Sequence, residues 1–108
     1  MNKNDLVYLY MFDLDVTLST STDLIYHRFG KIKNIRQIDI VSSRDKALMY
    51  EVELRVGTVV NVATYDTSWR IISLNDLKDK IETIVEIDDL KEHLLEQVND
   101  YIDEQNEI

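Results

Sequence analysis

Residues 68–85, SWRIISLNDLKDKIETIV, contain the point at which the chain changes from a strand pattern to a helix pattern. Ser73 followed by Asp76 is a variant of the capping box that opens a helix. Ile72 and Leu77 flank this pair and can form a hydrophobic staple. Apolar residues then recur three or four positions apart, at Leu77, Ile81, Ile84 and Val85. The stretch therefore predicts that strands end and a helix begins near residue 73.

The chain upstream of this point, residues 5–74, favours β-strands. The clearest alternation covers residues 48–56, LMYEVELRV, and predicts a strand with one buried face. We also expect strands at 6–18, about 23–29, 32–41, 58–65 and 68–74. Polar clusters or glycines separate them, at 19–22, Gly30, 42–45, Gly57-Thr58 and 66–67. Gly57-Thr58 suits a two-residue hairpin because glycine tolerates a positive φ. Such short loops predict an antiparallel meander of five or six strands.

The last third of the chain, residues 75–108, is expected to be helical. A second helix start appears at Asp88 or Asp89, and the apolar residues beyond it form one stripe: Leu90, Leu94, Val98, Tyr101 and Ile102. No Gly or Pro separates the two helical pieces, so either a helix pair or one long bent helix fits the pattern. The predicted fold is α+β, a single domain over residues 1–108 with an antiparallel sheet covered by C-terminal helix.

Composition is typical of one small globular domain. The chain has 108 residues, of which 44% are hydrophobic and 31% charged. It contains no Cys, which excludes disulfides, thiolate metal sites and cysteine nucleophiles. No apolar run approaches the roughly 18–20 residues of a membrane span, and no secretory cleavage site is visible. We therefore expect a cytoplasmic protein that does not contact membranes.

Charge is distributed very unevenly. Residues 75–108 contain twelve Asp or Glu and three Lys or Arg, which gives -9. Residues 1–74 contain nine of each and sum to zero. The predicted helical region therefore carries the whole formal charge of -9. Such an asymmetry indicates a protein that meets a positively charged surface.

Like charges recur three or four residues apart from Asp88 to the C-terminus, in eight pairs. At roughly 0.2–0.5 kcal/mol each, eight pairs cost on the order of 2–4 kcal/mol at low salt. Several of these acids also lie at the negative end of the helix dipole. Either the tail frays or a partner relieves the repulsion. We predict partner contacts at Glu92, Glu96, Asp100, Asp103, Glu104 and Glu107. A solvated face that only maintains solubility explains the same residues.

Residues 12–18, FDLDVTL, resemble the first motif of haloacid-dehalogenase-type phosphatases. The resemblance implies a carboxylate nucleophile at Asp13, a general acid/base at Asp15, and Mg²⁺ held by Asp13 and a later acid pair such as Asp88-Asp89. It also implies a parallel sheet with crossover helices. A half-exposed strand that shows its polar face to solvent explains the same letters: Asp13, Asp15 and Thr17.

Other polar and aromatic residues are interpreted structurally. His27 and His93 lack neighbours at the spacing of metal ligands, so no metal site is expected. His93 is expected to reduce the electrostatic repulsion between Asp89 and Glu96. Trp69 and Tyr65 are expected to pack across strands, or to form an interface anchor. A short basic segment is too sparse for nucleic acid and is expected to pair with the chain's own acidic helix: Arg28, Lys31, Lys33 and Arg36.

The chain resembles immunity proteins, antitoxins and phage-encoded anti-restriction or anti-CRISPR inhibitors in character, since it is small, acidic and without an evident reaction centre. We therefore expect a non-catalytic inhibitor that blocks the basic, nucleic-acid-binding site of a partner such as a nuclease. It would use no cofactor and would not bind nucleic acid directly. The alternatives are a small phage structural or assembly protein and a haloacid-dehalogenase-like phosphatase. The oligomeric state is left open.

Overall fold

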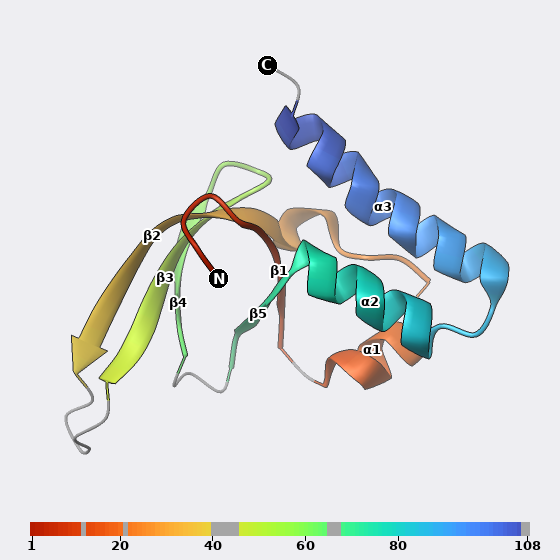
Figure 1. The fold of residues 1–108 in the computed structure, drawn as a ribbon, viewed down its shortest axis with the longest axis horizontal. Coiled ribbons are helices and arrows are strands. Elements are labelled where there is room, and N and C mark those ends of the chain that lie inside the picture. Colours follow the sequence, from red (N-terminus) through yellow and green to blue (C-terminus); the bar gives the residue numbers. More distant parts are fainter. Residues whose placement is uncertain (12, 21, 40–45, 65–67, 107–108) are drawn as a thin grey trace.

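A computed structural model describes residues 1–11, 13–20, 22–39, 46–64 and 68–106. It contains one sheet of five antiparallel strands with helices packed on one side, which confirms the predicted α+β class (Figure 1). The strands are β1 (Leu6–Tyr10), β2 (Phe29–Asp39), β3 (Lys46–Leu54), β4 (Val59–Ala63) and β5 (Arg70–Ser73). The helices are α1 (Leu14–Thr20), the 3₁₀ helix η1 (Tyr26–Arg28), α2 (Leu74–Ile84) and α3 (Asp88–Asn106).

The strands follow the order β4-β3-β2-β1-β5 across the sheet. The first four are therefore neighbours in the order of the sequence, as in a meander. β5 instead returns to the other side and pairs antiparallel with β1, Val7 opposite Ser73 and Tyr10 opposite Arg70. Because α2 follows β5 directly, this return places the helical region beside β1 rather than beyond β4.

Each face of the sheet has its own hydrophobic core. On the helical side, Tyr8, Phe29 and Ile72 pack with residues of all three α-helices. The Phe29 ring lies between Tyr8 and Tyr101, with ring centroids 4.9 Å and 5.2 Å away. On the other side the main residues are Val7, Leu9, Ile32, Tyr50, Val52 and Val62. Alternate residues of β1 and β5 thus serve opposite cores, as the pleat requires, whereas β3 and β4 contribute only to the core on the side away from the helices.

The helical region forms as the sequence predicts. The Ser73 hydroxyl accepts a hydrogen bond from the Asp76 backbone N–H at 3.3 Å, which caps α2. Ile72 and Leu77 are buried in the same core, as the staple requires. The two helical pieces are separate helices, since α2 ends at Ile84 and α3 begins at Asp88. The apolar stripe of α3 faces the core, with Leu90 and Ile102 partly buried at its edges.

The predicted strand over residues 6–18 is wrong beyond Tyr10. β1 ends there, and residues 14–20 form helix α1 instead. The pattern misled because Leu14 and Leu18 fit a period of two and also lie four apart, on one face of a helix. Both are buried. The Asp13 carboxylate accepts a hydrogen bond from the Asp15 N–H at 2.9 Å, as a helix-capping residue does.

The predicted strand over residues 23–29 is also wrong, because Tyr26–Arg28 form η1 and β2 starts at Phe29. Gly30 therefore lies inside a strand rather than in a turn. Gly57 has the expected positive φ of 94°. The hairpin loop is longer than the expected two residues. It comprises residues 55–57 and is closed by a hydrogen bond from the Leu54 N–H to the Thr58 carbonyl. The turns expected at 42–45 and 66–67 lie outside the described residues.

Among the described residues, no helix combines the length and the apolar character that a membrane crossing requires.

Gly30 is required by close packing between β2 and β3. A Cβ atom there would lie 2.6 Å from Val52 Cγ1 and 3.0 Å from the Glu53 carbonyl oxygen. We expect Gly30→Ala to lower the free energy of unfolding by about 1–3 kcal/mol, as overpacking does. Urea denaturation measures this loss. It should be smaller when Gly30→Ala is introduced into a Val52→Ala background, because the clashing methyl is gone; full additivity of the two losses would contradict the packing.

Candidate functional site

Helix α3 presents a row of carboxylates to solvent. Its buried side consists of Leu94, Val98 and Tyr101, none more than 1% exposed. The opposite side carries exposed acids, here called the acidic face: Asp88, Glu92, Glu96, Asp100 and Asp103. These residues also line a shallow hollow, to which Leu95 adds an apolar side chain and Lys91 a cation.

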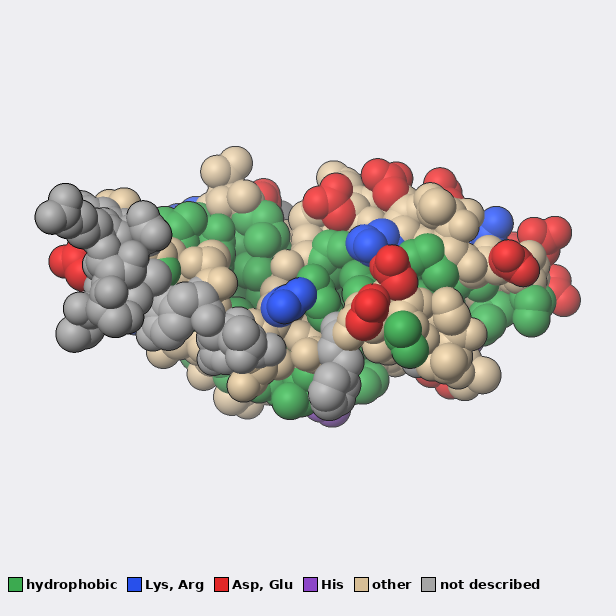
Figure 2. Space-filling model, turned by 90° about the horizontal axis from the view of Figure 1, so that it is seen from below, with side chains coloured by type: hydrophobic (Ala, Val, Ile, Leu, Met, Phe, Trp, Pro, Cys, Tyr) green, Lys and Arg blue, Asp and Glu red, His purple; other side chains and the backbone are tan. Residues whose placement is uncertain are grey.

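The charge of the acidic face is not balanced by the helix itself. The last turn of α3 carries no basic residue, although the negative end of a helix dipole favours one. On the side of the molecule seen in Figure 2, acidic side chains gather over the helical half rather than over the sheet. The predicted contacts Glu92, Glu96, Asp100 and Asp103 are all exposed and line the same hollow on α3.

Glu104 differs from these four residues. Its carboxylate accepts two hydrogen bonds from the Arg55 guanidinium, at 2.6 Å from Nη2 and 3.0 Å from Nε. Arg55 lies in the β3–β4 hairpin loop, 49 residues away in the sequence. Glu104 is thus joined to the chain's own sheet. Glu107, the remaining predicted contact, lies outside the described residues.

Three aromatic rings surround Arg55. Its guanidinium carbon lies 3.9 Å from the ring centroid of Tyr26, 5.3 Å from that of Tyr101 and 5.6 Å from that of Phe29. The side chain is only 11% exposed. The guanidinium combines an ion pair with cation–π contacts, which fastens the C-terminal half of α3 to the hairpin.

The N-terminal half of α3 is fastened to the segment before η1. The Leu24 N–H donates to Gln97 Oε1 at 2.9 Å, and His93 Nε2 lies 2.6 Å from Asp23 Oδ1. His93 was expected to act between Asp89 and Glu96 on its own helix. Its ring contacts Asp23 instead, because the 22–25 segment runs beside α3.

The basic segment predicted to pair with α3 lies elsewhere. Among the described residues, Lys33 is 4.0 Å from Glu53 of β3, and the Arg28 guanidinium lies 5.3 Å from the Trp69 ring centroid. Arg55, which the sequence analysis placed in a strand, is the cation that reaches α3. The spacing of residues in the sequence does not connect Arg55 with Glu104. The excess of acidic residues on α3 was the only signal that a cation would be needed beside it.

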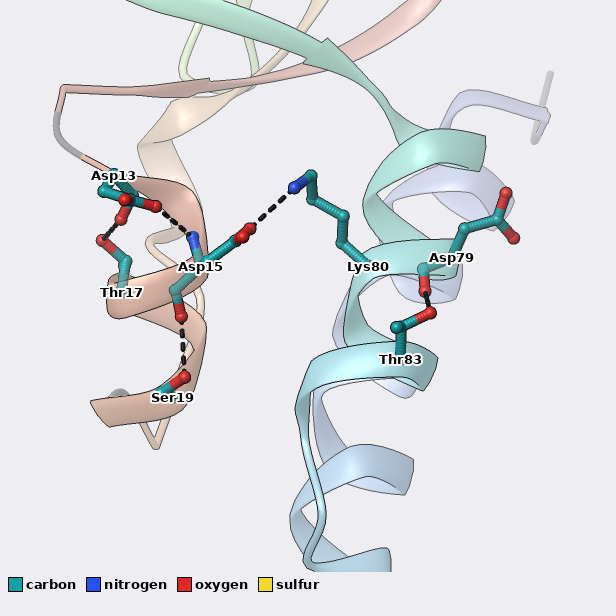
Figure 3. A network of polar contacts seen from close by, with 7 residues as sticks. All are labelled: Asp13, Asp15, Thr17, Ser19, Asp79, Lys80 and Thr83. Carbon is teal, nitrogen blue, oxygen red and sulfur yellow. Dashed lines mark hydrogen bonds and ion pairs between the residues drawn. The ribbon is translucent and has the colours of Figure 1, made fainter.

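Within the FDLDVTL stretch, residues 13–17 form a local polar network at the start of α1 rather than a half-exposed strand (Figure 3). Asp13 caps α1, and the Asp15 carboxylate accepts a hydrogen bond from Lys80 of α2 at 2.6 Å. This hydrogen bond is the main reason that the pKa of Lys80 is raised. A shallow hollow beside them also includes Arg70. The contacts join α1 to α2.

The sheet around this network is antiparallel, whereas the resemblance to haloacid-dehalogenase-type phosphatases implies a parallel one. In the described part of the chain, no three His, Asp or Glu residues are grouped so that they could hold a metal ion. Asp88 and Asp89 accordingly do not form a metal site with Asp13. The stretch resembles the motif of that family, but the sheet beside it is not the parallel sheet that the resemblance implies.

Comparisons of the chain with protein-family models, with curated proteins and with solved structures found no match. Function must therefore be inferred from the surfaces of the chain itself. Among these, the acidic face of α3 combines a high charge density with a firmly held backbone.

The contacts around Arg55 should contribute measurably to stability. We expect Arg55→Met to lower the free energy of unfolding by about 1–3 kcal/mol, because it removes an ion pair and cation–π contacts that are largely shielded from water. Glu104 is 41% exposed, so Glu104→Gln should cost about 0.5–1 kcal/mol. Lys33→Met, at the looser pair with Glu53, is the matched control. Equal urea midpoints for Arg55→Met and Lys33→Met would exclude the fastening role.

Tyr101 should make stability sensitive to alkaline pH. Burial raises its pKa from 10.0 to about 12, with a further increase from Glu104 and an opposing effect of Arg55. The folded state therefore favours the protonated Tyr101 hydroxyl more than the unfolded state does. The stability that results is fully present below pH 10, where the hydroxyl is protonated in both states, and is lost as pH rises through about 12.

Tyr101→Phe should therefore reduce the loss of unfolding free energy between pH 10 and 12, as measured by denaturation at several pH values. Tyr26→Phe removes a hydroxyl from an exposed ring against Arg55 and is the control. An unchanged alkaline loss in Tyr101→Phe would show that its hydroxyl does not ionise at the expense of the fold.

Proposed function

We propose that this chain is a non-catalytic binding protein that inserts the acidic face of α3 into a basic, nucleic-acid-binding site on a partner protein and blocks it. The observation that supports this most directly is the exposed row formed by Glu92, Glu96, Asp100 and Asp103 on one face of α3. Successive turns of a helix are about 5.4 Å apart, so such a row places negative charges at short, regular intervals. Nucleic-acid-binding sites recognise a similar line of backbone charges.

The firm attachment of α3 supports the proposal. One side of the helix is buried, its N-terminal half is bonded to Asp23 and Leu24, and its C-terminal half is bonded to Arg55. A row of charges on a fixed backbone loses little conformational freedom when it binds. Binding through this face would therefore require ordering of the carboxylate side chains but not of the helix that carries them.

The unbalanced charge supports it further. Lys91 is the basic residue that lines the hollow on this face, among five acids. Opposite charges on a partner would relieve the repulsion between neighbouring acids and accelerate encounter. Glu104 is expected to contribute less than the other predicted contacts, because Arg55 already neutralises it.

The proposed partner is a basic protein that handles nucleic acid, such as a nuclease, in the cytoplasm. Small acidic proteins of this style act as immunity proteins, antitoxins or inhibitors of restriction and CRISPR systems. The proposal requires neither a cofactor nor direct contact with nucleic acid. It assigns no reaction to the Asp13–Asp15 network, whose carboxylates are engaged in capping α1 and pairing with Lys80.

Charge reversal on α3 tests the proposal. The triple variant Glu92→Lys, Glu96→Lys and Asp100→Lys should weaken partner binding by at least about tenfold at low ionic strength and reduce its salt dependence. Proteins captured from an extract of the source cells are compared between the parent and this variant at low and high salt. Each purified candidate is then tested for release of a labelled nucleic acid by the parent protein.

A matched control distinguishes an effect of the acidic face of α3 from an effect of the protein's net charge. Three exposed acids elsewhere, Asp79 and Glu82 of α2 and Glu86 of the segment between α2 and α3, allow a second triple reversal with the same change in net charge. We expect this control to retain binding and to displace nucleic acid as the parent does. Equal loss in both triples would mean that only net charge matters, and unchanged binding in the α3 triple would leave this face as a solvated surface.

A further inference from the structure

Strand β4 forms one end of the sheet, and no described strand is paired with its outer side (Figure 1). Backbone hydrogen bonds join Leu54 to Thr58 and Thr64 to Leu48 at the two ends of the β3–β4 pairing. The register between them is regular, so every second residue of β4 bonds to β3. The other residues point their backbone N–H and C=O groups away from β3: Val59, Asn61 and Ala63.

The accessible part of this edge runs from Val59 to Asn61. Val59 is 51% exposed and Asn61 is also exposed, whereas Ala63 is buried. None of the described residues hydrogen-bonds to the outward groups of Val59 and Asn61. Edge strands are commonly protected by charged side chains, proline or bulges. β4 has the sequence VVNVA and a regular register, and so has none of these. Its backbone is therefore open to an added strand.

One face of this edge is apolar. Val60 and Val62 lie on the side of the sheet away from the helices, where Val62 is buried in the core. Together with Trp69 and Leu54 they line a largely apolar hollow of about 210 Å³. Apolar side chains of an added strand would extend this face, because neighbouring strands place their side chains side by side.

The other face is acidic. Asn61 lies opposite Glu51 of β3 and Val59 lies opposite Glu53, so these four side chains share one face. Glu53 is 4.0 Å from Lys33, and no ion pair of the described residues includes Glu51. A second copy of this chain would bring the same two glutamates and a further net charge of -9, so like charges oppose self-pairing. A strand with basic residues on this face is favoured instead.

We propose that the edge of β4 binds an extended, basic segment of a partner protein as an added antiparallel strand. Lysine or arginine residues at alternate positions lie on the side of the two glutamates, and the apolar residues between them lie beside Val60 and Trp69. The backbone groups of Val59 and Asn61 pair with those of the basic residues, because residues directly opposite each other share a face. Main-chain hydrogen bonds then supply affinity, and the alternate side chains supply specificity.

A short synthetic peptide with blocked ends, Lys-Val-Lys-Val-Lys, is the probe. We expect it to bind with a dissociation constant of about 0.1–1 mM, and its acidic counterpart Glu-Val-Glu-Val-Glu to bind at least about tenfold more weakly. At a peptide concentration of about ten times the dissociation constant, proton exchange of the Val59 and Asn61 amides with water should slow about tenfold. NMR of the parent protein measures this exchange.

Two N-methylated peptides test the hydrogen bonds. Methylation of the lysine backbone nitrogens removes the N–H groups that face β4, whereas methylation of the valine nitrogens changes groups that face away. The first peptide should bind about tenfold more weakly or worse, and the second should bind as the unmodified peptide does. Equal affinities of these two peptides, or slowed exchange confined to α3, would overturn the proposal.

Asn61→Pro removes one outward N–H and none of the hydrogen bonds to β3, a change that edge strands tolerate. We expect it to weaken peptide binding about tenfold or more, and Asn61→Thr to bind as the parent does. If Asn61→Pro alters the fold, the paired N-methylated peptides decide the question with the parent protein. Equal binding by the two folded variants would contradict the added strand.

A last comparison separates this edge from the function proposed for α3. The triple variant Glu92→Lys, Glu96→Lys and Asp100→Lys should still show slowed exchange at Val59 and Asn61 when the peptide is saturating, because its changes lie on α3. Loss of the slowed exchange in this variant would show that the peptide binds the acidic face and would overturn the edge site.

Discussion

The position of Phe29 between Tyr8 and Tyr101 determines how the two layers of this protein meet. Phe29 begins β2, Tyr8 lies in β1 and Tyr101 in α3, so three rings connect segments that are far apart in the sequence. Arg55 lies against Phe29, Tyr101 and the outer ring Tyr26, and binds Glu104 from there. Large aromatic side chains dominate the energetics of such cores. This cluster therefore fixes both the docking of α3 and the place of the β3–β4 hairpin.

The rotation of α3 follows from the same cluster. With about 100° between successive residues of a helix, Glu92, Glu96 and Asp103 lie nearly opposite the seam of Leu94, Val98 and Tyr101. Glu104 lies beside this seam, about one quarter turn from it, where a residue of the sheet can reach its carboxylate. The helical pattern alone could have separated Glu104 from the others. It could not have identified Arg55, because that contact joins residues 49 positions apart.

The sequence was informative where a pattern had only one structural solution. Residues 48–56 alternate clearly, and β3 (Lys46–Leu54) covers most of them, although Arg55 and Val56 lie in the hairpin loop. Ser73 and Asp76 mark a helix start, and α2 begins between them. The strand prediction failed at residues 13–18, because Leu14 and Leu18 fit the period of a strand and the period of a helix equally well. The helix forms there, with Asp13 as its capping residue. The pairing of β5 with β1 was not predicted either. Short loops favour a sequential meander, and loop length does not indicate which edge of the sheet a later strand will join.

Arg28 and Arg55 show how one residue type acquires different roles in the same fold. Both guanidinium groups lie against aromatic rings, but Arg55 also has a carboxylate partner in Glu104. Arg28 retains a buried N–H without an acceptor, at the wall of a cavity rather than in a packed cluster. Both groups nevertheless hold parts of the fold together, Arg55 through the Glu104 carboxylate and Arg28 through the Trp69 ring and the Tyr8 hydroxyl, whose pKa it lowers against the larger effect of burial.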